Sequence, residues 1–153
     1  MQKILIVNLI LLTTLNLKGQ IFKEKYIKDA TAVSNKWLNN ISSNNYSAAY
    51  SEYSNQVKEN SDSLYWLQAI DQLMKEFGTL EKREVINSEF KSNIENLGDG
   101  FYVFIEYASS YEKIKKCSEY MLLGQNDKIE WKILRYDFSY ESEELEPDKN
   151  SPN

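Results

Sequence analysis

The sequence contains no histidine and only one cysteine, and both absences restrict its chemistry. A lone Cys117 cannot form an internal disulfide, and we interpret it as structural because nothing obvious supplies a base. Without histidine the chain cannot assemble a Ser-His-Asp triad or a Cys-His pair, and common zinc sites lose their usual nitrogen ligand. Carboxylates, tyrosines, lysines and arginines remain as candidate catalytic groups. We predict no catalytic residue, no metal and no cofactor.

An excess of positive charge is also missing. The chain has 18 Lys and Arg residues against 23 Asp and Glu residues, and its net charge is −5. Nucleic acids and anionic membrane surfaces attract clustered Lys and Arg residues, which here are scattered among carboxylates. We therefore expect no nucleic-acid partner. The 153 residues, 42% of them hydrophobic, are enough for one domain with a sizeable core.

The first twenty residues, MQKILIVNLILLTTLNLKGQ, have the layout of a secretory signal peptide. A basic Lys3 precedes an apolar stretch over residues 4–17, and the small Gly19 follows it. A membrane span needs about 20 apolar residues, and this stretch is shorter and is interrupted by polar side chains. We predict export to the periplasm or outside the cell, with cleavage after Gly19 or Gln20. An uncleaved anchor is the alternative.

Apolar residues recur at helical spacing in three segments of the mature chain. The spacing predicts helices over residues 21–41, 46–57 and from about 62 to Phe77, and Gly78 can supply a left-handed cap that stops the last one. After Gly78 the pattern changes to strands, with turn signals at residues 96–100 and 124–128. We expect strands over these segments: 80–90, 101–109, 113–124 and 129–138.

Short connections between strands favour antiparallel neighbours. The sequence therefore predicts one α+β domain over residues 21–140, with N-terminal helices packed on a curved four-stranded antiparallel sheet. Residues 141–153 are acidic, contain both prolines and have almost no apolar side chain, and we predict that they are disordered.

Several segments, in this order and spacing, resemble a family of small exported bacterial proteins known as domain of unknown function 4019. They are ATAVSNKWL (30–38), NNYSAAY (44–50), FGTLEKR (77–83), GDGFYVFIEYASSY (98–111) and WKILRY (131–136), together with Trp66 and Glu119. The resemblance covers about residues 30–138. It implies a cystatin-like α+β cone, related to nuclear-transport-factor-2-like and polyketide-cyclase-like folds, and brings no known activity. One departure is Arg135, where the family usually has a small residue.

Cone-shaped folds of this kind can hold a ligand between helix and sheet, and five polar residues are candidates to bind it: Arg83, Tyr102, Glu106, Glu119 and Arg135. Tyr136 also lies near the expected pocket walls. Arginines grip carboxylates or phosphates bidentately, and tyrosines stack or donate hydrogen bonds. The competing interpretation, which we favour, is that Arg83 pairs with Glu106 or Glu119 across strands and braces the sheet.

The aromatic side chains can also be interpreted either as core residues or as a binding surface. Trp37, Trp66 and Trp131 lie on core-facing stripes, so we expect core packing rather than a stacking box. The tyrosines at 46, 50 and 53 either pack against the first helix or leave an aromatic patch for a partner.

Three functions are compatible with this sequence. The leading hypothesis is a non-enzymatic binding or interaction module in the cell envelope, which takes a protein or a small polar ligand. The second is a small-molecule enzyme of polyketide-cyclase-like type, with Glu106 as general acid or base. The third is an inhibitor or immunity-type protein with a basic partner. A homodimer is possible, because related folds often dimerise through the sheet.

Overall fold

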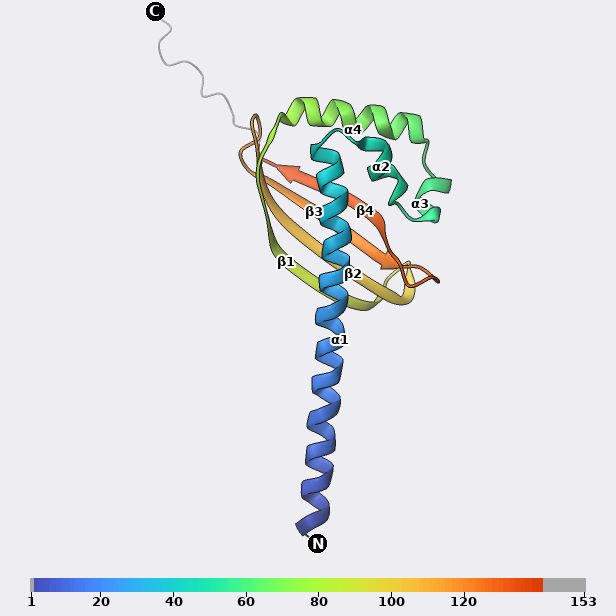
Figure 1. The fold of residues 1–153 in the computed structure, drawn as a ribbon, viewed down its shortest axis with the longest axis vertical. Coiled ribbons are helices and arrows are strands. Elements are labelled where there is room, and N and C mark those ends of the chain that lie inside the picture. The colour runs from blue at the N-terminus through green and yellow to red at the C-terminus, as the bar shows by residue number, and fades with distance from the viewer. Residues whose placement is uncertain (1, 142–153) are drawn as a thin grey trace, which may run out of the picture.

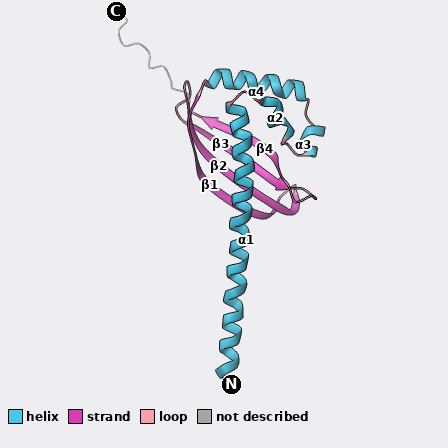
Figure 2. Cartoon of the chain, viewed as in Figure 1, coloured by secondary structure: helices cyan, strands magenta, loops and turns pink. Residues whose placement is uncertain are grey.

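The computed structural model describes residues 2–141 as four helices followed by four strands. The helices are α1 (Gln2–Ser42), α2 (Tyr46–Ser51), α3 (Asn55–Glu59) and α4 (Ser63–Phe77). The strands are β1 (Leu80–Ile94), β2 (Gly98–Tyr111), β3 (Cys117–Gln125) and β4 (Trp131–Tyr140). They form one antiparallel sheet in the order β1-β2-β3-β4, and α1 crosses one of its faces (Figure 1, Figure 2). The predicted α+β fold is confirmed. The predicted tail lies almost wholly outside the described residues.

The first predicted helix, over residues 21–41, is the second half of α1, which runs back without a break to Gln2. The blue N-terminal part of α1 projects past the sheet (Figure 1). Within residues 2–141 no helix is long and apolar enough to cross a membrane. Cleavage near Gly19 stays a prediction.

The two faces of the sheet differ in what covers them. Alternate residues of β2, such as Ile105 and Tyr107, are buried on the side covered by α1, which we call the inner face. Their neighbours Phe104 and Glu106 point to the opposite side, the outer face, and are only half-buried. The helices lie on the inner side (Figure 1). The core therefore sits between α1 and the inner face.

The predicted core role of the tryptophans is confirmed. Trp37 and Trp131 are buried, and Trp66 is half-buried with its ring 6.4 Å from that of Trp37. The tyrosines of the second predicted helix also pack inward. Tyr50 and Tyr53 place their rings 5.3 and 5.5 Å from Trp66, so they contact α4 as well as α1.

The prediction of one helix over residues 46–57 is wrong, because the chain between α2 and α3 pairs with the sheet. The N–H of Ile133 donates to the carbonyl of Glu52 at 3.1 Å, and the N–H of Ser54 donates to the carbonyl of Ile133 at 2.9 Å. Tyr53 thereby forms a parallel bridge to Ile133. These bonds satisfy part of the free edge of β4, which would otherwise expose unpaired backbone groups.

All four strands have boundaries that differ from the predicted ones, and the largest differences are at the end of β1 and the start of β3. β1 continues to Ile94 with three register shifts along it; β1 carries the extra residue at two of them, and β2 carries it at the third, between Lys91 and Asn93. β3 begins at Cys117 instead of residue 113, because the preceding turn bonds elsewhere. The N–H of Glu112 donates to the carbonyl of Thr79 at 2.8 Å, and that of Lys113 donates to the carbonyl of Phe77 at 3.0 Å.

Gly78 ends α4 as expected, although not in the left-handed helical conformation. Its φ of 77° is positive, but its ψ of −162° is extended. Only glycine adopts this region readily. A β-carbon at this position would also lie 2.9 Å from Cβ of Glu112. The sharp turn of the backbone from α4 into β1 therefore requires glycine for two reasons, its conformation and the lack of space for a β-carbon.

We expect Gly78→Ala to destabilise the protein more than Gly98→Ala. Gly98 has a similar φ of 82°, but a β-carbon there would meet nothing within 4 Å. Each variant incurs backbone strain of about 1–3 kcal/mol, and only Gly78→Ala adds a steric clash. Urea unfolding of the two variants measures the difference. Equal losses of stability would show that the close approach to Glu112 carries no energetic weight.

Candidate functional site

A buried ion pair between Arg83 and Glu119 lies on the inner face, near the end of the sheet where β1 and β3 begin. Arg83 comes from β1 and Glu119 from β3, on either side of β2, whose Ser109 and Tyr111 lie next to both. Tyr136 of β4 completes the group, so all four strands contribute a side chain. We call these five residues the inner network. They meet because the register sets Arg83 opposite Ser109 and places alternate side chains on one face.

The carboxylate of Glu119 accepts five hydrogen bonds. Arg83 forms a fork, with Nε 2.6 Å from Oε2 and Nη2 3.1 Å from Oε1. The hydroxyls of Tyr111 and Tyr136 donate to Oε1 at 3.0 and 2.7 Å, and Ser109 donates to Oε2. A carboxylate offers about four lone-pair sites, so no acceptor capacity remains for a ligand.

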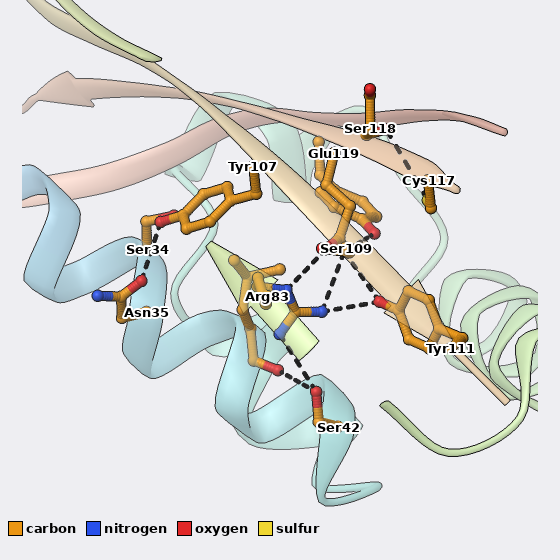
Figure 3. Close-up of polar contacts among 12 residues, drawn as sticks. Ser34, Asn35, Ser42, Arg83, Tyr107, Ser109, Tyr111, Cys117, Ser118 and Glu119 are labelled. Carbon is orange, nitrogen blue, oxygen red and sulfur yellow. Dashed lines mark hydrogen bonds and ion pairs between the residues drawn. The ribbon is translucent and has the colours of Figure 1, made fainter. Parts of the chain in front are cut away.

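The guanidinium of Arg83 is almost equally occupied. Its Nη2 also donates to the hydroxyl of Tyr111 at 2.7 Å, and its Nη1 donates to Oγ of Ser42 at 3.3 Å. The second bond ties β1 to the end of α1 (Figure 3). The side chain of Arg83 is only 9% exposed and that of Glu119 is fully buried.

A second tie joins α1 to β2. The hydroxyl of Tyr107 lies 2.8 Å from Oγ of Ser34 and 3.0 Å from Oδ1 of Asn35 (Figure 3). Together with Ser42, these contacts hold α1 against the inner face at two points. The apolar core alone would leave the helix freer to slide.

The electrostatics of the inner network keep Glu119 ionised. Burial by itself would raise its pKa, but the hydrogen bonds and charge of Arg83, with the donors from Ser109 and Tyr136, lower that pKa below its usual value. The pKa of Arg83 is raised: burial opposes its charge, but the hydrogen bond and charge of Glu119 outweigh it. Both charges are therefore fixed at neutral pH.

The hydroxyl of Tyr136 and the thiol of Cys117, which lie near Glu119, are held in their neutral forms. Burial, followed by the negative charge of Glu119, raises the pKa of Tyr136 well above its usual value and raises that of Cys117 to about 12. Cys117 is thus a protonated, buried thiol at neutral pH. This agrees with its interpretation as a structural residue.

The structure divides the five predicted site residues between two faces. Arg83 and Glu119 meet on the inner face, as the bracing interpretation required. Glu106 pairs in register with Tyr120 on the outer face, and Arg135 is also there.

Tyr102 packs near the turn before β2. Its hydroxyl donates to the carbonyl of Leu97 at 3.2 Å, and its ring lies over Gly124. The predicted residues therefore do not share one pocket, and a ligand-binding role for each stays a prediction.

The structure accommodates Arg135, the residue at which the sequence departs from the family pattern, on the surface. Its side chain is 70% exposed and forms an ion pair with Asp137 on the same strand. The large cation thus lies in solvent, and the inner face is unaffected by it.

The sequence analysis did not identify Ser42, Ser109 and Tyr111 as residues that contact Arg83 or Glu119. Ser109 and Tyr111 lie two and four residues after Tyr107, so strand alternation could have placed them on its face. Nothing local to Ser42 indicated its contact with Arg83, since 41 residues separate the two.

Two hollows border the inner network beside α1, apart from one at the end of the sheet whose lining includes Ser109. One, of about 440 Å³, lies between the end of α1, α4 and the start of β1, and its lining includes Ser42, Lys75 and Tyr111. The other, of about 420 Å³, lies between α1 and β1 and includes Asn35 and Arg83. A molecule in either hollow would meet the edge of the network and not its carboxylate, which is fully buried.

The fold and the inner network define an α+β protein whose open antiparallel sheet is covered on one face by helices and braced there by a buried ion pair. The profile of a family described as Protein of unknown function (DUF4019) matches residues 33–136. The chain belongs to that family, as its resemblance indicated. No curated protein and no solved structure matches it.

We expect Glu119→Gln to lower the free energy of unfolding by about 3–5 kcal/mol, because it leaves the buried charge of Arg83 unpaired. The double variant Arg83→Met with Glu119→Leu should recover most of this loss, since apolar pairs often replace buried ion pairs at little cost. Urea unfolding measures both. Asp71→Asn, which breaks the exposed pair with Lys75, is the control and should have a much smaller effect. Additive losses in the double variant would contradict a coupled pair.

The contribution of Glu119 to the free energy of unfolding should depend on pH. The folded-state pKa is below the unfolded value of about 4.3, so the contribution is complete above that pH and is lost as the pH falls through the folded-state pKa. The wild-type protein should therefore lose stability in acid more steeply than the Arg83→Met, Glu119→Leu double variant. Unfolding curves from pH 6 downwards test this. Parallel curves would mean that Glu119 has an ordinary pKa.

Proposed function

We propose that this protein is an exported, non-enzymatic binding or interaction module of the cell envelope. The observation that carries the proposal is the closed inner network. Its carboxylate has no free acceptor site, its arginine is almost fully bonded, and Glu119 stays ionised at neutral pH. A general acid needs a proton to give, and a strong base needs a raised pKa. Glu119 has neither property.

The alternative enzyme hypothesis is weakened by the position of Glu106. A general acid or base of that kind would be a carboxylate buried in an apolar pocket. Glu106 instead lies half-buried on the outer face, opposite Asn87 on β1 and Tyr120 on β3. It lies on the opposite side of the sheet from the inner network.

The outer face supports a binding role. Its centre is largely apolar, with Glu106 as the one charged residue on the two central strands: the rings of Phe104 and Tyr120 stack with centroids 6.1 Å apart, and Leu122 lies in register with Phe104. Charged residues surround this centre on β1 and β4, namely Glu84, Glu89, Lys91, Lys132, Arg135 and Asp137. An apolar centre with a polar rim is the usual layout of a protein interface.

Export is supported by the sequence of the first twenty residues, with its basic start, short apolar stretch and small Gly19. Cells that produce the full chain with a C-terminal tag should hold it in the envelope fraction, with its N-terminus at Gln20 or Ile21. A variant that lacks residues 2–18 is the control and should stay in the cytoplasm. A full chain that remains cytoplasmic with its leader attached would contradict the proposal.

The absence of turnover is tested on the purified mature protein. We expect that no small molecule of an envelope extract is consumed faster with wild-type protein than with the Glu106→Gln or Arg83→Ala variant, as followed by mass spectrometry. A compound that the wild type converts and either variant spares would establish an enzyme and overturn the proposal.

A further inference from the structure

We propose that the outer face binds an arginine side chain of another protein, which forms an ion pair with Glu106 and lies against the ring of Tyr120. The inference rests on the proposed function, because it names the chemistry that the outer face of the binding module recognises. It comes from a single charge at the centre of that face, which no residue in the described part of the chain neutralises.

Glu106 is the unpaired acid of the outer face. Four acids occupy the register rows of this face between Ser110 and Tyr102 of β2. Three of them contact a base: Glu84 pairs with Lys82 at 3.0 Å, Glu89 with Lys91 at 3.2 Å, and Asp137 with Arg135. Glu106 forms neither an ion pair nor a side-chain hydrogen bond within residues 2–141, although it is half-buried.

The other charges of the outer face make its centre negative. Glu84 and Glu89 lie on β1 in the two rows that flank the row of Glu106, and Asp137 lies in the same row. Three lysines lie two rows away, at positions 82, 91 and 132. Arg135 is the one base within a row of Glu106, and Asp137 neutralises it. The centre of the face therefore attracts a cation from outside the chain.

The side chains beside Glu106 favour arginine over other cations. Tyr120 is its register partner on β3, and the ring of Tyr120 stacks on that of Phe104. Side chains in register have their β-carbons about 4.5–5.5 Å apart, so a cation bonded to Glu106 would lie within about 6 Å of the ring of Tyr120. A guanidinium bonds a carboxylate with two parallel N–H groups, stacks on aromatic rings and is less strongly hydrated than an ammonium.

Small side chains leave room for the incoming arginine on the side of Glu106 away from Phe104. Ala108 follows Glu106 on the same face of β2, and its row continues with Ser118 and Ser139. All three line a hollow of about 450 Å³ at the end of the sheet. The two lysines of this hollow have acids of their own: Lys115 pairs with Glu81 at 2.7 Å and Lys116 with Glu141 at 2.8 Å.

The unpaired carboxylate also determines which partners are rejected. An apolar surface that covered the outer face would bury Glu106 without a counter-ion, and this is strongly unfavourable. A partner with an arginine at the matching position forms a charge-assisted pair instead. The same residue therefore favours one class of partner and disfavours the rest, which is how a specific interface discriminates.

An arginine probe tests the site on the mature chain. We expect Nα-acetyl-arginine methylamide, titrated to millimolar concentrations, to shift the NMR signals of the Glu106 carboxyl carbon and the Tyr120 ring. The citrulline derivative has nearly the same shape without the charge and should bind at least about tenfold more weakly. Glu106→Gln should abolish the response. Glu84→Gln, the same change on the same face, is the matched control and should retain it.

Urea unfolding checks that Glu106→Gln folds, which we expect because the change leaves no charge without a partner. Equal responses to the two probes, no response to arginine, or a response that survives Glu106→Gln would each overturn the proposal.

Cross-linking in cells separates this inference from the proposed function. A photoreactive phenylalanine analogue in place of Phe104 lies beside Glu106. An adduct with another protein that disappears with Glu106→Gln, and persists with Glu84→Gln, supports the arginine site. An adduct that persists with Glu106→Gln overturns the arginine site and leaves the binding module standing. The absence of any adduct overturns both.

Discussion

The buried pair of Arg83 and Glu119 is the constraint on which the rest of the structure depends. Removing two charges from water costs several kcal/mol per ion, and their attraction offsets this only when the remaining polar atoms are hydrogen-bonded. The chain meets the condition with donors from β2 and β4 and with Ser42 at the end of α1. A shift of register in any of the strands would leave a charge unsatisfied, so the pair fixes the arrangement as well as stabilising it.

The complete bonding of the inner network also restricts the surfaces on which a function can lie. The inner face is occupied by the helix, the core and the inner network, and its hollows reach only the edge of that network. The outer face has no described helix over it and combines a largely apolar centre with charged residues on β1 and β4. In the function we propose, the buried ionic chemistry serves the architecture and the open sheet surface serves recognition.

The sequence predicted the order of helices and strands because their periods differ clearly, and Gly78 marked the change. It also raised the pairing of Arg83 with Glu119, but could not choose Glu119 over Glu106. The segment around Glu106 is apolar on both faces, so its alternation is ambiguous. Around Glu119, by contrast, Cys117 and Met121 are buried on the same side.

What the sequence could not show depends on contacts between distant segments. The break at Tyr53 arises because β4 supplies hydrogen bonds that compete with those of a helix. The bond from Arg83 to Ser42 joins β1 to the end of α1, which lies 41 residues earlier in the chain. Neither feature can be predicted from local secondary-structure propensity. The division of the candidate residues between two faces likewise required the register of the sheet, since the bulges of β1 and β4 shift the alternation.

The account rests on Glu119 being a permanently ionised, fully bonded carboxylate, and the most direct test is its own titration. The chemical shift of its side-chain carboxyl carbon can be followed by NMR as the pH is lowered from 7. We expect the resonance to keep the shift of an ionised carboxylate well below the ordinary pKa of about 4.3, up to the point at which the protein unfolds. A midpoint at or above that ordinary value would mean that Glu119 can exchange a proton in the folded protein, and would contradict the structural role assigned to the pair.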